Sequence, residues 1–421
     1  MIMPINALKN RVARLEAKGD AIKQTLSRVE PLLSRIRATQ PYDISFVDSL
    51  GIPVHLTIRV SDLSETSFHS LKEWGLFDLT HVHSGKGLTA EQSRLSCIME
   101  AIERYSAGYH DLEGKTTTAT YHDIENTAID PRDFWLPPEV DFTPDRELVW
   151  YRGNNLFTRT AVCLPIDFVL MDIPDSAYPF TGFESKRLGF FFSNGLAAGT
   201  CIENALVSGI NEVVERDAQY RIAHQIEPYP TELDLSCEED FIPWRRLFDE
   251  NRLSLRAFFL QNVEGFYSVI VTSWDDYCRM LVTGTAADTN IRRATHSAIM
   301  ELVQQRSFMF FSLWRTRREY VPIIRYIREH RHPDLLESSP PSTFWTEQCN
   351  RSVRMDECRE ELLGNTSQIM ETLKRDHRII GLDLTHPAIG IPVVRVIISG
   401  LRNGYFDYQP TFTFVKESAT H

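Results

Sequence analysis

The sequence lacks any run of about eighteen consecutive apolar residues, the length that a membrane-spanning helix needs. Its amino terminus, MIMPINALKNRV, also lacks the apolar stretch of a signal peptide. The seven cysteines are scattered, odd in number and form no CxxC pair, which argues against a disulfide framework and against structural zinc. We therefore expect a cytoplasmic protein with no membrane partner.

Positive charge is also scarce. Lys and Arg number 45 against 57 Asp and Glu, which gives a formal net charge of -12. This balance would repel a phosphate backbone unless a local basic patch opposed it, so we expect no nucleic-acid partner. The chain has no low-complexity tail and no Gly/Ser-rich linker, and its 421 residues can bury a large core.

The first forty residues have a different pattern from the rest. Apolar residues recur there at helical spacing with Lys and Arg between them. We expect a helical extension over residues 1–40, with a turn at Gly19 and a second break near Pro31. A helical hairpin packed on the main domain is the favoured interpretation, and a partner-docking or dimerisation arm is the alternative.

Residues 41–421 predict one α+β domain. Strand-like runs such as VHLTIRV (54–60), AVCLPIDFVL (161–170) and FYSVIVTSW (266–274) are separated by helix-like segments. Further helices are expected over about 315–331 and 355–376, and the last strands are expected in RIIGLDLT and IPVVRVIISG.

Three segments, residues 84–108, 193–218 and 283–307, repeat one plan. In each, a small-residue turn leads into a helix-like run with Ser, three residues, Glu, two residues, then Glu or Gln. The instances are Ser96/Glu100/Glu103, Ser208/Glu212/Glu215 and Ser297/Glu301/Gln304. The intervals from Gly87, Gly199 and Asp288 to the first Glu are each thirteen residues. This recurrence predicts three related helices.

Residues three apart share a helix face, so each pair of carboxylates faces the same way. A single pair is explained by a solvated face, with Arg104 neutralising the first. The neighbouring runs LSCIM, LVSGI and SAIM are strongly apolar, however, so we expect largely buried helices whose carboxylates need partners. All-oxygen ligands without a His/Cys cluster suit Mg²⁺, and a nucleoside triphosphate with its magnesium ions is the natural source of cations.

We expect the three helices to converge on this ligand. The acidic residues that would meet there are Glu100, Glu103, Glu212, Glu215 and Glu301, with Gln304 and Asn204 as neutral oxygen donors. Lys86 and Arg306 would face phosphate oxygens, and Gly85 and Gly87 would let backbone N–H groups approach closely.

No GxxxxGK[ST] loop occurs. His81 and His83 form an HxH pair that could bind metal, although the alternation of side chains along a strand explains the pair as well and is the interpretation we favour.

With these residues assembled, the chain resembles the YcaO family of ATP-dependent peptide-modifying enzymes from about residue 41 to residue 404. The matching pieces are SGKG at Ser84, Sx3ExxER from Ser96 to Arg104, SNGLAAG at Ser193, EVVERDA at Glu212, ExxQxR from Glu301 to Arg306, and DLTHPAIGIPVVRVIISGL from Asp383. The resemblance implies a YcaO-type catalytic domain with mixed sheets and buried acidic helices.

The resemblance also implies site roles. Lys86, Ser96 and Arg306 would contact ATP, together with Gln304 and Asn204. The magnesium ligands would be Glu100, Glu103, Glu212, Glu215 and Glu301. The family often has a Glu eight residues before the Glu212 position, where this chain has Asn204, a neutral ligand. No catalytic residue beyond these is assigned.

Members of the family use ATP to activate a backbone amide of a ribosomally made peptide. Attack by a neighbouring Cys, Ser or Thr gives an azoline, and attack by external sulfide gives a thioamide. Many azoline-forming members end in a PxPxP tail, whereas this chain ends YQPTFTFVKESATH, so we favour a thioamide. The resemblance further implies a precursor peptide or protein as substrate and a separate partner, TfuA-like or E1-like. A homodimer stays open.

Two other classes stay open as well. A small-molecule ATP-dependent ligase or kinase would share the ATP and magnesium machinery but would have a pocket too small for an extended peptide. A non-catalytic scaffold would bind ATP only to stabilise a complex, and its ATP turnover would never rise with a peptide and partner.

Overall fold

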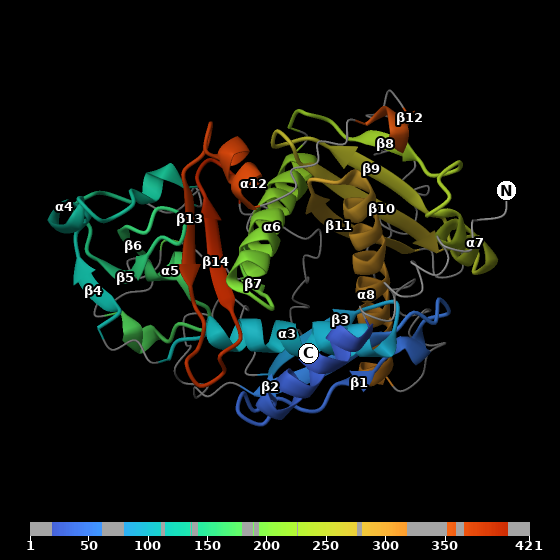
Figure 1. Ribbon diagram of the computed structural model, residues 1–421, viewed down its shortest axis with the longest axis horizontal. Coiled ribbons are helices and arrows are strands. Elements are labelled where there is room, and N and C mark those ends of the chain that lie inside the picture. Colours follow the sequence, from blue (N-terminus) through green and yellow to red (C-terminus); the bar gives the residue numbers. More distant parts are fainter. Residues whose placement is uncertain are drawn as a thin grey trace, which may run out of the picture.

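The structure, a computed structural model, describes residues 19–60, 80–110, 114–134, 136, 142–178, 188, 193–224, 226–275, 280–317, 352–358 and 366–402. Four small sheets are packed with helices (Figure 1). The expected α+β class is confirmed. Across the described ranges, every helix is too short or too polar to cross a bilayer.

The described part of the amino-terminal extension packs on the main body. Residues 19–29 are helical, with Gly19 inside the helix rather than in a turn, and a 3-10 turn at Glu30–Leu32 follows where Pro31 was expected to break it. The apolar face of this segment, including Val29 and Leu33, is buried in a core that also contains residues of α3, β5 and β13. Residues 1–18 lie outside the described ranges.

The first sheet has the order β1-β2-β3 and carries one long helix. Its strands are β1 (Tyr42–Asp43), β2 (Val54–Val60) and β3 (Thr80–Lys86), with a 3-10 turn at Ser45–Val47. The predicted strand over 54–60 is confirmed. Helix α3 (Ala90–Ser106) packs on β2 and β3, and the side chain of its N-cap residue Thr89 accepts a hydrogen bond from the Gln92 N–H.

Two three-stranded sheets lie on the other side of α3, with orders β4-β5-β6 and β13-β14-β7. Their strands are β4 (Thr116–Ala119), β5 (Leu148–Asn154), β6 (Ala161–Pro165), β7 (Leu196–Ala198), β13 (Ile379–Asp383) and β14 (Val393–Ile398). Short helices α4 (Tyr121–Ile124) and α5 (Ile166–Val169) and 3-10 turns at Pro131–Asp133 and Asp175–Ala177 connect them. The run 161–170, expected as a strand, is thus a strand followed by α5.

The fourth sheet has five strands in the order β11-β10-β9-β8-β12. They are β8 (Thr231–Asp234), β9 (Arg256–Leu260), β10 (Tyr267–Asp275), β11 (Met280–Asp288) and β12 (Ser352–Arg354). The remaining elements are α6 (Ile202–Ala223), α7 (Ile242–Glu250), α8 (Ile291–Arg317), a 3-10 turn at Met355–Glu357 and α12 (Thr366–Leu373).

Two further helix predictions are only partly covered by the structure. Of the helix expected over 315–331, residues 315–317 form the end of α8 and the rest lies outside the described residues. Of the helix expected over 355–376, the structure contains the 3-10 turn and α12.

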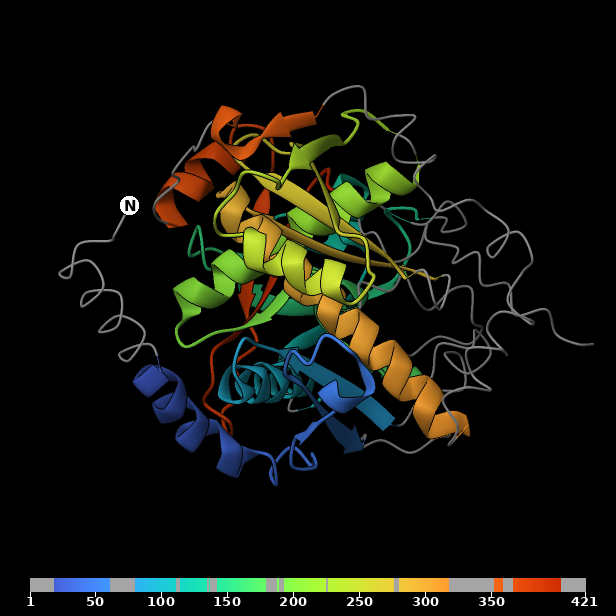
Figure 2. The same cartoon turned by 90° about the vertical axis from the view of Figure 1, so that its right-hand side faces the viewer.

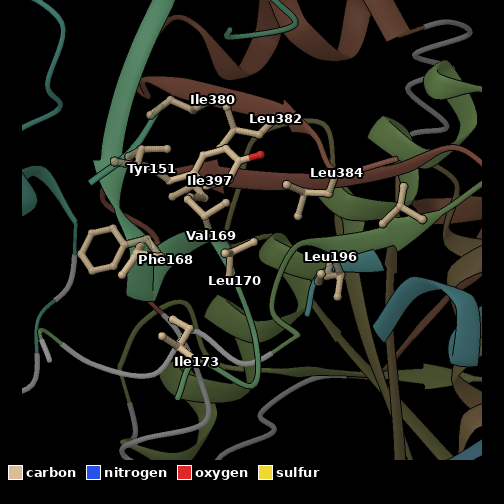
Figure 3. Close-up of a cluster of buried hydrophobic side chains, with 14 of the residues drawn as sticks. Tyr151, Phe168, Val169, Leu170, Ile173, Leu196, Ile380, Leu382, Leu384 and Ile397 are labelled. Atoms are coloured by element: carbon tan, nitrogen blue, oxygen red, sulfur yellow. The ribbon is translucent and has the colours of Figure 1, made fainter. Parts of the chain in front are cut away.

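Among the described residues, three large hydrophobic cores and one small cluster are present. The first core surrounds α5, β5, β6 and β13, and Figure 3 shows Phe168 and Val169 of α5 beside Tyr151, Ile380 and Ile397. The second core lies between α8 and the five-stranded sheet, and the third between α6, β14 and α12.

The three repeated segments form three strand-turn-helix units: β3-α3, β7-α6 and β11-α8. Among the described strands, β3, β7 and β11 are each an edge strand of their sheet. Each helix is anchored in a different core: α3 through Ile102 in the first, α8 through Leu302 in the second and α6 through Val214 in the third. Helix α6 lies between β14 and β11, and α8 reaches across to β3 (Figures 1 and 2). The junction of the three units is therefore also the junction of the three cores.

Candidate active site

The carboxylates of α3 meet the backbone edges of two different sheets. Glu100 accepts a hydrogen bond from the Ser84 backbone in β3, and Glu103 Oε2 accepts one from the Ala198 N–H in β7 at 3.2 Å. On the third unit, Gln304 Nε2 donates to the Ser84 carbonyl oxygen at 2.9 Å and to the Ser84 hydroxyl at 2.7 Å. Side chains of α3 and α8 thus meet at Ser84, and α3 is joined to the second unit.

Lys86 lies at the centre of the acidic residues. Its ammonium group forms an ion pair with Glu301 of α8. Burial lowers the pKa of Lys86 to about 8, and the negative charges of Glu215, Glu100 and Glu212 oppose that shift. Carboxylates from all three helices therefore act electrostatically on one lysine. The convergence expected from the sequence is observed for these residues.

Burial raises the pKa values of three of the acidic residues, Glu100, Glu103 and Glu212. Burial raises the pKa of Glu103 to about 8, and the charges of Glu212 and Glu100 raise it further while Arg104 lowers it. Burial also raises the pKa of Glu100 and of Glu212. Carboxylates with raised pKa values gain most from an added cation, so their chemistry fits a divalent metal ion.

Two arginines that were not assigned to the site contact its carboxylates. Arg104 lies 3.6 Å from Glu100 and 3.5 Å from Glu103. Arg216 repeats this arrangement on α6, at 3.4 Å from Glu212 and 3.4 Å from Glu215. The sequence contained the signal, because a Glu-Arg dipeptide closes the motif in both of the first two repeats.

Glu215 is also fixed by uncharged groups. Its Oε1 accepts hydrogen bonds from Thr285 Oγ1 of β11 at 2.7 Å and from Gln219 Nε2 at 3.1 Å. These contacts join the second unit to the third. Neither Thr285 nor Gln219 belongs to the repeated pattern, so sequence reasoning had no signal by which to select them.

Not every expected residue faces the acidic centre. Asn204 is exposed near the start of α6, where its Nδ2 donates to Thr200 Oγ1 at 3.0 Å. Ser96 is half-buried, one turn before Glu100 on the same face of α3. Among the described residues, no three His, Cys, Asp or Glu side chains are already arranged as metal ligands.

Arg306 occupies a position different from the expected one beside phosphate oxygens. Only 4% exposed, it donates from Nε to Asp48 Oδ1 and from Nη2 to Asp275 Oδ2, each at 2.8 Å, and its guanidinium lies 4.7 Å from the Phe310 ring centre. The reason is geometric: Arg306 follows Gln304 by two residues, and residues two apart point to nearly opposite sides of a helix.

The glycines beside Lys86 have a packing role that the sequence did not reveal. A Cβ on Gly85 would lie 2.0 Å from the Cys97 backbone nitrogen, and one on Gly87 would lie 2.4 Å from that of Ser93. The missing side chains let β3 and its turn pack directly on the backbone of α3.

His81 and His83 lie on one side of β3, as alternation along a strand requires, with ring centres 6.4 Å apart. His81 Nε2 lies 3.2 Å from Asp172, and burial holds the pKa of His83 well below its usual value. The pair is explained by these strand contacts.

Comparison with known families identifies the class. The family model described as YcaO cyclodehydratase, ATP- and Mg²⁺-binding, matches residues 84–402. This match covers more than half of the chain, so the chain belongs to the YcaO family. The assignment made from the sequence motifs is confirmed, and ATP and Mg²⁺ are the cofactors of the protein.

Two uncharacterized relatives match most of this chain. An uncharacterized protein of Methanothermobacter thermautotrophicus is 27% identical over 90% of this chain and 93% of its own length. A protein encoded in the tfuA 3′ region of Rhizobium leguminosarum bv. trifolii is 24% identical over 90% of this chain and 87% of its own.

Two solved structures share the fold. YcaO from Methanopyrus kandleri, bound with AMPPCP and Mg²⁺, has a TM-score of 0.63 and 23% identity, with 91% of each chain covered. A heterocyclase in complex with substrate and cofactor has a TM-score of 0.69 and 20% identity, covering 90% of this chain and 52% of that one.

Proposed function

We propose that this protein uses ATP and Mg²⁺ to activate a backbone amide of a ribosomally synthesised peptide or protein, and that the amide oxygen is exchanged for sulfur to give a thioamide. The observation that carries the proposal is the gathering of carboxylates from α3, α6 and α8 around Lys86, in a chain of the YcaO family. The relative encoded beside tfuA supports the thioamide branch and a TfuA-like partner.

The donor set fits magnesium. We assign Glu100, Glu103, Glu212, Glu215 and Glu301 as its ligands, because they are partly buried oxygen donors and the pKa values of Glu100, Glu103 and Glu212 are raised. When bound, the metal ions neutralise phosphate charge and stabilise the charge that is transferred. Ser96, Gln304 and Asn204 are kept as expected nucleotide contacts.

The cations of the site have two roles in this scheme. In the structure, Arg104 and Arg216 balance the carboxylates of their own helices, and Lys86 balances Glu301. All three side chains are partly exposed, so each can exchange its carboxylate partner for a phosphate oxygen when the nucleotide binds. Positive groups fixed near the transferring phosphoryl group lower the barrier to its transfer.

The reaction balances as follows. A sulfur nucleophile forms a bond to the amide carbon, and the electron pair of the C=O bond moves to oxygen. That oxygen takes the γ-phosphoryl group and ADP leaves. Cleavage of the carbon-oxygen bond then releases phosphate, and the sulfur gives up its proton to water as the C=S bond forms. The logic is that phosphate is a good leaving group and an amide oxygen is a poor one.

Azoline formation is the second candidate. The family is described as a cyclodehydratase, and a similar fold belongs to a heterocyclase. In that case the side chain of a neighbouring Cys, Ser or Thr attacks, and the amide nitrogen loses its proton as the C=N bond forms.

The experiment is coexpression with a TfuA-like or E1-like partner and the precursor encoded nearby, followed by accurate mass measurement of the precursor. A gain equal to the difference between sulfur and oxygen supports thioamidation, and loss of one water per site supports the azoline. The Glu215→Gln variant is the matched control and should leave the precursor unmodified. An unmodified precursor with the active protein, together with ATP turnover that peptide and partner do not raise, would count against both candidates.

A further inference from the structure

Arg395, in the middle of β14, is fully buried with 0% of its surface exposed. A buried arginine is costly unless its N–H groups are satisfied. Its Nη1 donates to the Asn194 carbonyl oxygen at 2.7 Å and its Nε donates to the Val169 carbonyl oxygen at 3.0 Å. The guanidinium is therefore held by two backbone segments that precede β7 and end α5.

These anchors place the guanidinium against the segment that leads into β7, which adjoins carboxylate-bearing parts of two helices. Arg395 pairs with Leu196 in β7, two residues before Ala198, whose N–H donates to Glu103. On the other side, Asn194 precedes Gly195, where a Cβ would lie 2.8 Å from Val213, the neighbour of Glu212 in α6. Glu103 and Glu212 thus both adjoin the segment that Arg395 holds.

The electrostatics agree with this placement. Burial lowers the pKa of Arg395 to about 10, and the negative charges of Glu212 and then Glu103 oppose the shift. Glu212 and Glu103, which come from the second and the first strand-turn-helix unit, therefore both act electrostatically on Arg395.

We propose that Arg395 is a positioning residue, a fixed counter-cation that holds Glu103 and Glu212, and with them α3 and α6, in the arrangement that binds the metal-nucleotide complex. The last step rests on the proposed function. Lys86, Arg104 and Arg216 differ from Arg395 because their side chains are 27%, 25% and 20% exposed. They can exchange partners when a ligand binds, whereas the carbonyl groups that hold Arg395 cannot move without the fold.

The guanidinium group explains why this position needs arginine. Its planar fork donates in several fixed directions and stays charged, so it can serve two carbonyl oxygens and still face a carboxylate. A lysine would keep the charge but would present a single nitrogen to all of these partners.

The first test is a pair of double-mutant cycles on the nucleotide-free protein, followed by urea unfolding above the Glu103 pKa of about 8. Arg395→Met should lower the urea midpoint. In the Glu212→Gln background, Arg395→Met should lower the urea midpoint by less than it does in the unaltered protein, because the negative charge that Arg395 balances has been removed. In combination with Glu301→Gln, whose partner is Lys86, the two losses should add. Equal losses in both backgrounds would overturn the assignment.

The second test is binding of Mn²⁺, followed by its electron paramagnetic resonance signal, in the presence of AMPPCP. Arg395→Met should weaken Mn²⁺ binding by about 10- to 100-fold, the range typical of residues that orient metal ligands. Ile397→Ala is the matched control, because it removes a buried side chain two residues along the same strand without a change of charge. Unchanged Mn²⁺ affinity in the arginine variant, or an equal loss in the control, would refute the positioning role.

If Arg395→Met does not fold, Arg395→Lys takes its place in both measurements, with a smaller but measurable loss of Mn²⁺ affinity expected. Neither measurement depends on a peptide or on turnover. Failure of the proposed amide chemistry would leave both results unchanged, so the two ideas fail separately.

Discussion

Replacement of Arg306 by methionine should destabilise the whole fold rather than weaken nucleotide binding by a stable protein. The guanidinium ties α8 to Asp48, in the turn before β2, and to Asp275, at the end of β10. The carboxylates are as deeply buried as the arginine, with side-chain exposures of 1% and 7%. Removal of the arginine leaves two aspartates without their main counter-charge.

The size of the effect follows from this burial. Removal of one partner from a buried ion pair costs about 3–5 kcal/mol, because the other charge stays desolvated. Burial raises the pKa of Asp48, so protonation of that group relieves part of the cost. We therefore expect a loss of about 3–5 kcal/mol in the free energy of unfolding rather than twice that amount, which is still a large part of the ~5–15 kcal/mol that stabilises a typical domain.

Urea unfolding and binding of a non-hydrolysable ATP analogue should be measured on the same samples. The matched control is Arg293→Met on the same helix. Arg293 is 60% exposed and pairs with Asp288, so its loss should cost less than about 1 kcal/mol. If Arg306→Met keeps the stability of the unaltered protein but loses the nucleotide, the arginine faces phosphate in solution and our reasoning from the buried triad is wrong.

Three further predictions concern the site and the extension. Glu100→Gln or Glu215→Gln should abolish ATP turnover and weaken Mg²⁺-nucleotide binding in calorimetry while leaving the circular dichroism spectrum unchanged; ATP hydrolysis at the original rate would remove them as ligands. The pKa of Glu103 is raised from 4.5 to about 8, so its folded form holds a proton that the unfolded chain releases; metal-free stability should fall as the pH rises from about 4.5 to about 8, and Glu103→Gln should flatten that part of the urea-midpoint profile. An equally steep profile in the variant would contradict this assignment. Leu33→Ala should cost about 2–5 kcal/mol in urea unfolding, because Leu33 is buried in the first core, whereas no loss would show that the extension only docks partners.

The repeated motif predicted much of the site because helical spacing is a local property. Once Glu100 and Glu103 lie on a helix, their common face follows, and the equal intervals in the other segments predicted the same for α6 and α8. The convergence of these helices was predicted because buried carboxylates need a partner, and one metal-nucleotide ligand can serve all three helices. This part of the site could be predicted from the chain alone.

What could not be predicted depends on contacts between distant residues. Arg306 satisfies the family motif, yet its partners Asp48 and Asp275 lie far away in the sequence and carry no pattern. Arg395 lies in an apolar strand whose alternation says nothing about a guanidinium group. The glycines beside Lys86 are ambiguous in the sequence because a close helix and a close phosphate both exclude a Cβ, and the close helix became visible only in the fold.

The anchoring of α3, α6 and α8 in separate cores has a consequence for the energetics of unfolding. A ligand that contacts all three helices stabilises the arrangement in which they meet, rather than any single core. Without nucleotide, we expect native-state hydrogen exchange to report separate opening reactions for the three helices. With Mg²⁺ and AMPPCP bound, their slowest amides should exchange with one common free energy, because the ligand makes three cooperative units behave as one.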